Sequence, residues 1–198
     1  MASTSSISNT WKIVCLFDKS GSMESMMIKK PTAVDSINEF ILSQKGEGDN
    51  NNTMSLILFD DLLTEVFLDV NVNSVLEIKS SDFKPDGSTA LMDAVGKTIE
   101  RFSSDPNVFI VILTDGQENS SINFTMKDIN KLIREHKLKG WRFKFLGTNQ
   151  DSWNVGHKMG LDRDDCHNFE PNSASMTNMM RAISSNVTEG TQPGVIRR

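Results

Sequence analysis

The chain has 198 residues, a formal net charge of −5 and 37% hydrophobic residues, a length typical of one sizeable domain. Leu, Ile, Val and Phe make up about a quarter of it, which is enough for a buried core and excludes intrinsic disorder for most of the chain. Acidic residues outnumber basic ones, and basic residues never cluster beyond a pair. We therefore expect no nucleic-acid partner.

The ends of the chain and its cysteines suggest where the protein works. No apolar run approaches the roughly 18 residues needed to cross a bilayer, so we expect no membrane partner. Residues 1–10 are rich in Ser and Thr, lack the parts of a signal peptide, and are interpreted as a flexible tail. Residues 190–198 are interpreted as a second tail, which leaves residues 11–189 as the domain. Cys15 and Cys166 have no zinc-like spacing, which favours a reduced, cytoplasmic protein.

The hydrophobic pattern predicts alternating strands and helices. Short apolar runs rich in β-branched and aromatic residues predict strands at 13–17, 56–59, 65–68 (the hairpin partner of the second), 108–113, 141–145 and 166–169. Apolar residues at helical spacing predict helices at 24–45 (with Pro31 near its start), 91–102, 126–133 (behind a Thr125–Asp128 capping box), 151–159 and 176–187. This order indicates an α/β fold, a doubly wound, mostly parallel sheet with helices on both faces.

Polar residues gather where the predicted strands end. Asp18, Ser20 and Ser22 follow the first strand, Asp115 follows the 108–113 strand, and Thr89 lies in the loop before helix 91–102. Binding sites of doubly wound sheets form at this carboxyl edge, so we expect these five side chains to meet there. All five offer oxygen only, which selects Mg²⁺, with Mn²⁺ or Ca²⁺ as alternatives, over zinc or copper. Two carboxylates and three neutral hydroxyls would leave the ion electrophilic toward one more anion.

These motifs resemble a known family. Asp18-x-Ser20-x-Ser22, Thr89 within Gly-Ser-Thr-Ala-Leu-Met-Asp-Ala, and Leu-Thr-Asp115-Gly look like the von Willebrand factor type A (vWA) domain with an intact metal-ion-dependent adhesion site (MIDAS). The resemblance covers roughly residues 11–187 and implies a Rossmann-like fold with one short antiparallel edge strand and a divalent metal. It makes Ser20, Ser22 and Thr89 hydroxyl ligands, while Asp18 and Asp115 bind directly or through water. The chain looks most like stand-alone bacterial or phage-encoded members.

Simpler interpretations compete at single positions. Ser20 and Ser22 are also suited to capping the following helix. A hairpin turn explains Asp60 and Asp61 as well as an outer-shell role does. Asp93 is interpreted as part of a solvated helix face, and Glu118 as part of a loop. Met26 and Met27 fit either core packing or an apolar rim around the metal. Residues 147–151 fit a helix N-cap better than an anion-binding site. The three histidines, His136, His157 and His167, share no ligand spacing and are not expected to be catalytic.

Three functions fit these observations. The favoured one is a non-enzymatic protein-binding module in which an Asp or Glu of a partner protein completes the metal shell. A second is self-assembly, with the acidic segment 162–165 of one copy filling the metal site of the next. The third is a Mg²⁺-dependent phosphohydrolase with Asp18 as nucleophile. That enzyme class needs a second acid two residues later, where this chain has Ser20.

Overall fold

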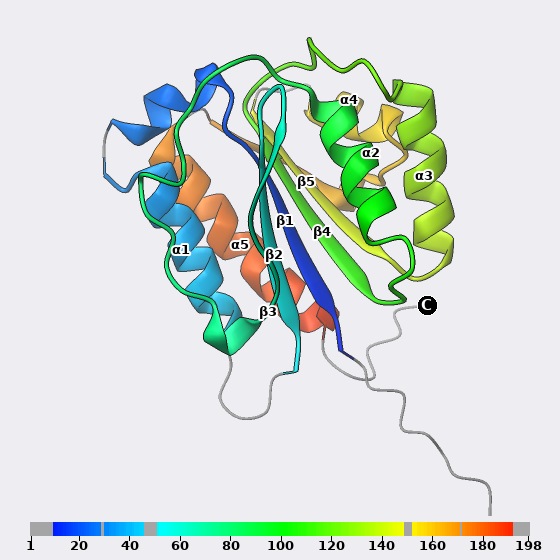
Figure 1. Cartoon of the computed structure of the whole chain (residues 1–198), viewed down its shortest axis with the longest axis horizontal. Helices are drawn as coiled ribbons and strands as arrows, with labels where there is room; N and C mark the ends of the chain where they lie inside the picture. Colours follow the sequence, from blue (N-terminus) through cyan, green and yellow to red (C-terminus); the bar gives the residue numbers. More distant parts are fainter. Residues whose placement is uncertain (1–9, 29, 46–50, 149–151, 171, 192–198) are drawn as a thin grey trace, which may run out of the picture.

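The computed structural model of the chain describes residues 10–28, 30–45, 51–148, 152–170 and 172–191. Within these residues six strands form one sheet in the order β3-β2-β1-β4-β5-β6 (Figure 1). The parallel strands are β1 (Lys12–Asp18), β2 (Thr53–Phe59), β4 (Val108–Thr114), β5 (Arg142–Thr148) and β6 (Cys166–Phe169). At one edge β3 (Leu63–Asn71) pairs antiparallel with β2. The predicted Rossmann-like, mostly parallel sheet is confirmed.

Helices cover both faces of the sheet. One face packs against α1 (Ala33–Gln44) and α5 (Ser173–Thr191), and the other against α2 (Leu91–Arg101), α3 (Met126–Leu138) and α4 (Ser152–Lys158) (Figure 1). Three short 3₁₀ helices complete the description, namely η1 (Gly21–Met27), η2 (Val72–Ser74) and η3 (Arg163–Asp165). The capping box predicted for α3 is present, with the Thr125 hydroxyl accepting from the Asp128 amide.

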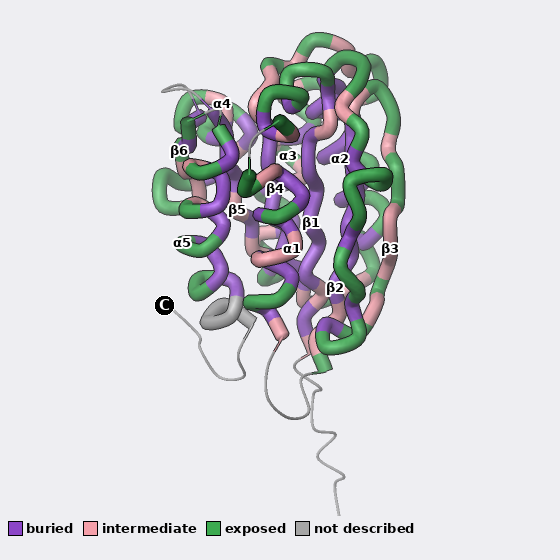
Figure 2. Tube along the Cα trace, turned by 90° about the vertical axis from the view of Figure 1, so that its left-hand side faces the viewer, coloured by how far each residue is buried: buried purple, intermediate pink, exposed green. Residues whose placement is uncertain are grey.

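The core consists of two apolar layers, one on each face of the sheet (Figure 2). Strand β4 is buried along its whole length, as a strand covered by helices on both sides requires. Met23 and Met26 are fully buried in the layer under α1, and Met27 packs against that layer. The structure therefore supports core packing for these methionines rather than an adaptable rim around the metal loops.

The helix predicted within 24–45, with Pro31 near its start, is confirmed from Ala33 onward, but the separate short helix before Pro31 was not expected. Residues 21–27 form η1, and α1 begins only at Ala33, behind a capping box between Thr32 and Asp35. The physical reason is Pro31, which has no amide hydrogen to donate and disfavours helical backbone in the residue before it. The apolar spacing continues across this break because both pieces pack on the same layer.

The ends of the described chain bear on two further predictions. Helix α5 continues to Thr191, two residues into the segment predicted as a C-terminal tail. Residues 1–9, 149–151 and 192–198 lie outside the description, and with them most of both predicted tails and part of the N-cap expected at 147–151.

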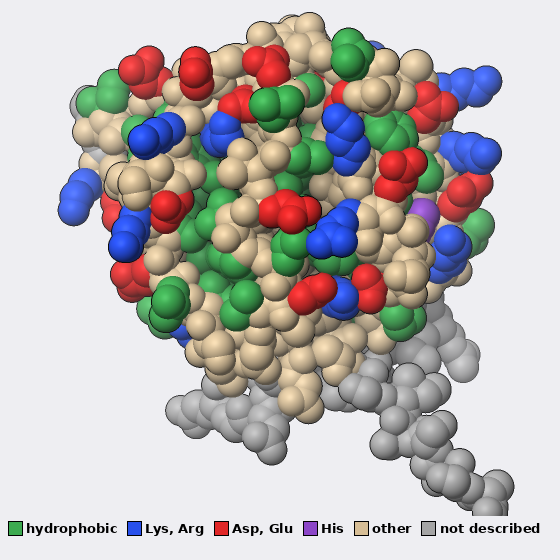
Figure 3. Space-filling model, in the orientation of Figure 1, with side chains coloured by type: hydrophobic (Ala, Val, Ile, Leu, Met, Phe, Trp, Pro, Cys, Tyr) green, Lys and Arg blue, Asp and Glu red, His purple; other side chains and the backbone are tan. Residues whose placement is uncertain are grey.

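None of the helices in the described ranges is long and apolar enough to span a bilayer. Positive and negative side chains are interspersed on the face seen in Figure 3.

Candidate metal centre

The order in which the chain adds strands to the sheet reverses between β1 and β4. From β1 the chain adds β2 and β3 on one side, then crosses to build β4, β5 and β6 on the other. At such a switch point the loops leaving the two central strands diverge and open a crevice at the carboxyl edge. Asp18 is the last residue of β1, and Asp115 follows the last residue of β4. Both acidic residues predicted as ligands therefore lie at this crevice.

Backbone hydrogen bonds bring the third segment to the same place. The Gly21 amide donates to the Gly87 carbonyl at 3.2 Å, and the Asp86 amide donates to the Lys19 carbonyl at 2.9 Å. Gly87 has a φ of +70°, a left-handed conformation that glycine adopts without strain. The loop that carries Thr89 is thus tied to the loop that carries Ser20 and Ser22, although about 70 residues separate them in the sequence.

Hydrogen bonds link side-chain oxygens of the loops that follow β1 and β4. The hydroxyls of Ser20 and Ser22 lie 3.1 Å apart, and Ser22 Oγ donates to Asp115 Oδ1 at 2.5 Å. Asp18 accepts a hydrogen bond from the Ser20 amide at 2.7 Å and one from the Thr114 hydroxyl at 2.5 Å. We refer to Asp18, Ser20, Ser22, Thr89 and Asp115 as the rim site.

Gly116 shows how closely the rim site converges. A Cβ placed on this residue would lie 2.6 Å from Thr89 Oγ1, 3.4 Å from Asp18 Oδ2 and 3.4 Å from Ser22 Oγ. Three oxygens from two distant segments therefore surround one point beside Gly116, which belongs to the third segment. Only a residue without a side chain leaves that space open.

Both carboxylates of the rim site have a raised pKa. Burial raises the pKa of Asp115 to about 6, and the negative charge of Asp18 adds to this, while the hydrogen bond from Ser22 opposes it. Burial also raises the pKa of Asp18, against the hydrogen bonds from Thr114 and Ser20. A cation between the two carboxylates would relieve both effects.

The donor set of the rim site fits a hard divalent cation. It contains carboxylate and hydroxyl oxygens and no nitrogen or sulfur, as Mg²⁺, Mn²⁺ and Ca²⁺ prefer. Two negative charges balance one divalent ion. In the described part of the chain, His, Cys, Asp and Glu form no cluster of three that could hold a metal, so a metal at the rim site would depend on its three hydroxyls.

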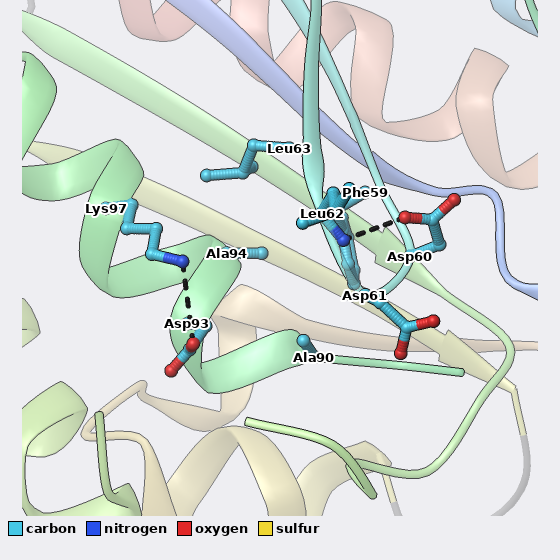
Figure 4. A pocket seen from close by; sticks show the side chains of 9 residues that line it. All are labelled: Phe59, Asp60, Asp61, Leu62, Leu63, Ala90, Asp93, Ala94 and Lys97. Atoms are coloured by element: carbon cyan, nitrogen blue, oxygen red, sulfur yellow. Dashed lines mark hydrogen bonds and ion pairs between the residues drawn. The ribbon is translucent and has the colours of Figure 1, made fainter. Parts of the chain in front are cut away.

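A buried ion pair braces the rim site from outside. The Lys19 ammonium contacts the Asp60 carboxylate, and both side chains are mostly buried. Asp60 also accepts from the Leu62 amide at 2.8 Å, and its carbonyl accepts from the Ala90 amide at 2.9 Å (Figure 4). Asp60 thus links the loops on either side of the rim site without contacting the five donors. Asp60 is therefore a turn residue, as the hairpin interpretation predicted, and its contacts also tie together the loops of the rim site.

We expect Asp60→Asn to weaken divalent-metal binding by about 10-fold, because loss of outer-shell groups misaligns first-shell ligands. Titration calorimetry with Mn²⁺ measures this change. The matched control is Asp61→Asn, since Asp61 is exposed and its carboxylate accepts from Ser88 at 3.2 Å. Equal affinities for the two variants and the wild type would show that Asp60 does not position the ligands.

The solvated interpretation of Asp93 was wrong, whereas Glu118 lies in a loop, as expected. Asp93 is buried, with 4% exposed, and its carboxylate accepts from the Asn123 amide at 2.8 Å and the Phe124 amide at 2.9 Å. Glu118 accepts from the Met92 amide at 2.8 Å at the start of α2. Glu118 thus lies at the N-terminus of α2, where negative charge is favourable, while Asp93 anchors the loop that precedes α3. Sequence periodicity gives no sign of such long-range partners.

The remaining charged candidates lie away from the rim site. The acidic segment 162–165 precedes β6, and Asp165 pairs with Lys137 and Lys144 at 3.1 and 3.2 Å. Lys137 also contacts Asp162. His136 is buried against Trp141, with ring centroids 4.4 Å apart. Within the described residues, none of the three histidines belongs to a group of side chains that could bind a metal.

Comparison with known proteins assigns the chain to a protein family. The family model described as the von Willebrand factor type A domain matches residues 12–182, which is most of the chain. This chain belongs to the vWA family. The comparison of the vWA chain with curated protein sequences gives no match.

Solved structures share the fold of this vWA domain. The vWF domain of the type V pili tip protein Mfa5 from Porphyromonas gingivalis matches with a TM-score of 0.66 and 11% identity, covering 95% of this chain and 98% of that one. The PilB minor pilin from Streptococcus sanguinis matches with a TM-score of 0.65 and 13% identity over 92% of this chain. Proximal thread matrix protein 1 from the mussel byssus, with a zinc-occupied MIDAS motif, matches with a TM-score of 0.65 and 14% identity over 90% of this chain. The chain spans 62% of that pilin's length and 48% of the byssus protein's.

The vWA domain uses several residues at the rim site that sequence analysis did not single out. Thr114 orients Asp18, Gly116 leaves the central space open, and Asn119 accepts from the Thr89 amide at 2.9 Å. Thr114 and Gly116 directly flank Asp115 in the motif already recognised. Asn119 carries no comparable signal, because its role depends on the approach of two loops.

Proposed function

We propose that this vWA domain is a non-enzymatic protein-binding module that holds a divalent cation at a MIDAS-type rim site. An Asp or Glu side chain of a partner protein completes the coordination of that ion. The observation that carries the proposal is the convergence of Thr89, Asp18 and Ser22 oxygens around the open space at Gly116. An octahedral ion held by five or fewer protein oxygens keeps a position for water or for an incoming carboxylate.

Mg²⁺ is the ion proposed for the rim site, with Mn²⁺ or Ca²⁺ as alternatives, because all five donors are oxygens. The mussel byssus protein of similar fold has a zinc-occupied MIDAS motif, so zinc belongs in the metal titration as a competitor. The ligand set proposed is Asp18, Ser20, Ser22, Thr89 and Asp115. When bound, the ion would supply an electrophilic site for an anionic oxygen.

The two other functions receive less support. A phosphohydrolase needs a cation near the phosphate, yet the Lys19 ammonium contacts Asp60 instead of the rim site. In segment 162–165 the carboxylates of Asp162 and Asp165 already pair with lysine, which leaves the exposed Asp164 as the acidic group for self-assembly. We also propose a stand-alone, cytoplasmic protein of bacterial or phage type, which agrees with Cys15 and Cys166 being free.

We expect Ser20→Ala combined with Asp115→Ala to abolish partner capture and leave the fold intact, because it removes a hydroxyl and a carboxylate ligand while the core stays unchanged. The measurement is a pull-down from the native host, run in parallel with Mg²⁺ and with EDTA, with circular dichroism to check folding. Binding that survives both the substitutions and EDTA would show that no metal mediates capture.

Two controls complete the pull-down. Ser25→Ala combined with Asp164→Ala removes the same chemical groups from two exposed positions outside the rim site, and it should bind the partner normally. Light scattering with and without EDTA detects self-assembly. A metal-dependent increase in particle size would indicate that the partner is a second copy of the chain rather than a different protein.

A further inference from the structure

A cavity adjoins the rim site on the side of β5. It has a volume of about 270 Å³ and lies among the ends of β4 and β5 and the first turns of α2, α3 and α4. Thr114, Asp115 and Gly116 line the cavity, and the last two also border the rim site. A partner chain whose carboxylate reaches the rim site would therefore have its neighbouring residues beside this cavity.

The walls of the cavity are suited to an apolar group. Four apolar side chains line it, namely Leu91, Met126, Phe145 and Val155. Two of its polar side chains already have partners, since the Thr148 hydroxyl donates to the Asp115 carbonyl at 2.8 Å and Glu118 accepts from backbone amides. Burial of apolar surface, rather than new hydrogen bonds, is what this cavity offers a ligand.

The size and charge of the cavity narrow the choice of occupant. Its volume lies below the roughly 300–1,000 Å³ of sites for drug-sized molecules and suits a single large side chain. The carboxylates of Asp115 and Glu118 border it, so a second acidic group would be repelled there. Ile28, Leu62, Ile122 and Trp153, four of the seven exposed large apolar side chains in the described chain, also lie at the carboxyl edge of the sheet. The edge proposed to receive the partner therefore carries exposed apolar side chains in addition to the cavity.

We propose that the cavity binds a large apolar side chain of the partner, such as Leu, Met or Phe, located next to the acidic residue that completes the metal shell. This inference rests on the proposed function and adds a sequence requirement to it. The partner motif is an acidic residue with an adjacent large apolar residue, and Val155 helps to select the latter.

The test uses a phage library of random heptapeptides, selected on the Mg²⁺-loaded protein and eluted with EDTA. Three proteins are compared: the wild type, Val155→Phe, which fills the cavity, and Asn154→Phe, which adds the same ring at the neighbouring exposed position. Mn²⁺ calorimetry and thermal unfolding establish that all three proteins bind metal equally and are folded.

We expect the wild type to select peptides with an acidic residue beside a large apolar one. These peptides should bind Val155→Phe about 10-fold or more weakly, the loss expected when one large side chain is no longer buried, and should bind Asn154→Phe normally. Selected peptides that share the acidic residue but no apolar neighbour, or that bind Val155→Phe equally well, would overturn the inference and leave the proposed function standing. Failure to recover any EDTA-eluted peptide would overturn both.

Discussion

Gly116→Val should lower the affinity for Mn²⁺ and Mg²⁺ by about 100-fold or more, exceeding the effect of losing an outer-shell group. The first carbon of the new side chain would lie 2.6 Å from Thr89 Oγ1, which is far inside contact distance, and close to oxygens of Asp18 and Ser22. The valine would therefore occupy the space proposed for the ion and displace the Thr89 hydroxyl. Titration calorimetry measures the affinity, and circular dichroism checks the fold.

Gly21→Ala is the matched control for this substitution. Gly21 lies in the same group of loops, yet a Cβ there would meet only the Gly87 carbonyl at 3.5 Å, an ordinary contact. We expect its metal affinity to stay within about threefold of the wild type, the scatter usual for a change that touches no ligand. Normal metal binding by a folded Gly116→Val protein would place the ion elsewhere.

Asp93→Ala should reduce the free energy of unfolding by about 3 kcal/mol at pH 7, a loss typical of removing a buried carboxylate that accepts several hydrogen bonds. The carboxylate holds the amides of Asn123 and Phe124, and the Phe124 ring packs over Gly96, where a Cβ would come within 2.6 Å of it. Without Asp93 the segment 122–124 would lose its attachment to α2. Urea unfolding followed by circular dichroism measures the change.

The effect of Asp93→Ala should also depend on pH. Burial raises the pKa of Asp93, but hydrogen bonds from Asn123 and Phe124 outweigh it and lower the pKa to about 2. The folded state therefore binds this proton less readily than the unfolded state, whose pKa is about 3.9. The stability due to ionised Asp93 is present above that value and is lost as the pH falls toward 2, so the difference between wild type and variant should drop to about half near pH 3.

Glu100→Ala is the control for both stability measurements, because Glu100 is exposed on the same helix. Its unfolding free energy should stay within about 0.5 kcal/mol of the wild type at either pH. A difference between wild type and Asp93→Ala that is the same at pH 7 and pH 3 would show that the carboxylate contributes through packing rather than through its charge.

Local sequence determined most of the fold. Strand β6 occupies the residues predicted for it, and α3 begins at its predicted capping box. These elements are predictable because burial on one or both faces imposes a periodicity that the sequence must carry. The break before α1 was missed, since Pro31 interrupts the helix without interrupting the apolar spacing.

The rim site was predicted from its position after the strands, before any contact was visible. Two motifs after strands and one before a helix are enough to indicate that Asp18, Asp115 and Thr89 share one edge of a parallel sheet. The contacts that brace that edge could not be predicted from the sequence. Lys19 with Asp60, and Asp93 with Asn123, depend on loops that approach each other only after the sheet has formed.

The sequence by itself determined the alternation of strands and helices, the family resemblance and the five residues proposed as oxygen ligands. Only the tertiary structure decided that Gly116 leaves the central space open, that Asp93 and Glu118 are structural acids, and that an apolar cavity adjoins Asp115. The physical reason is the range of the interactions. Periodicity and capping act between residues a few positions apart and are visible in the sequence, whereas cavities and loop contacts join segments whose separation is set by the packing of the whole domain.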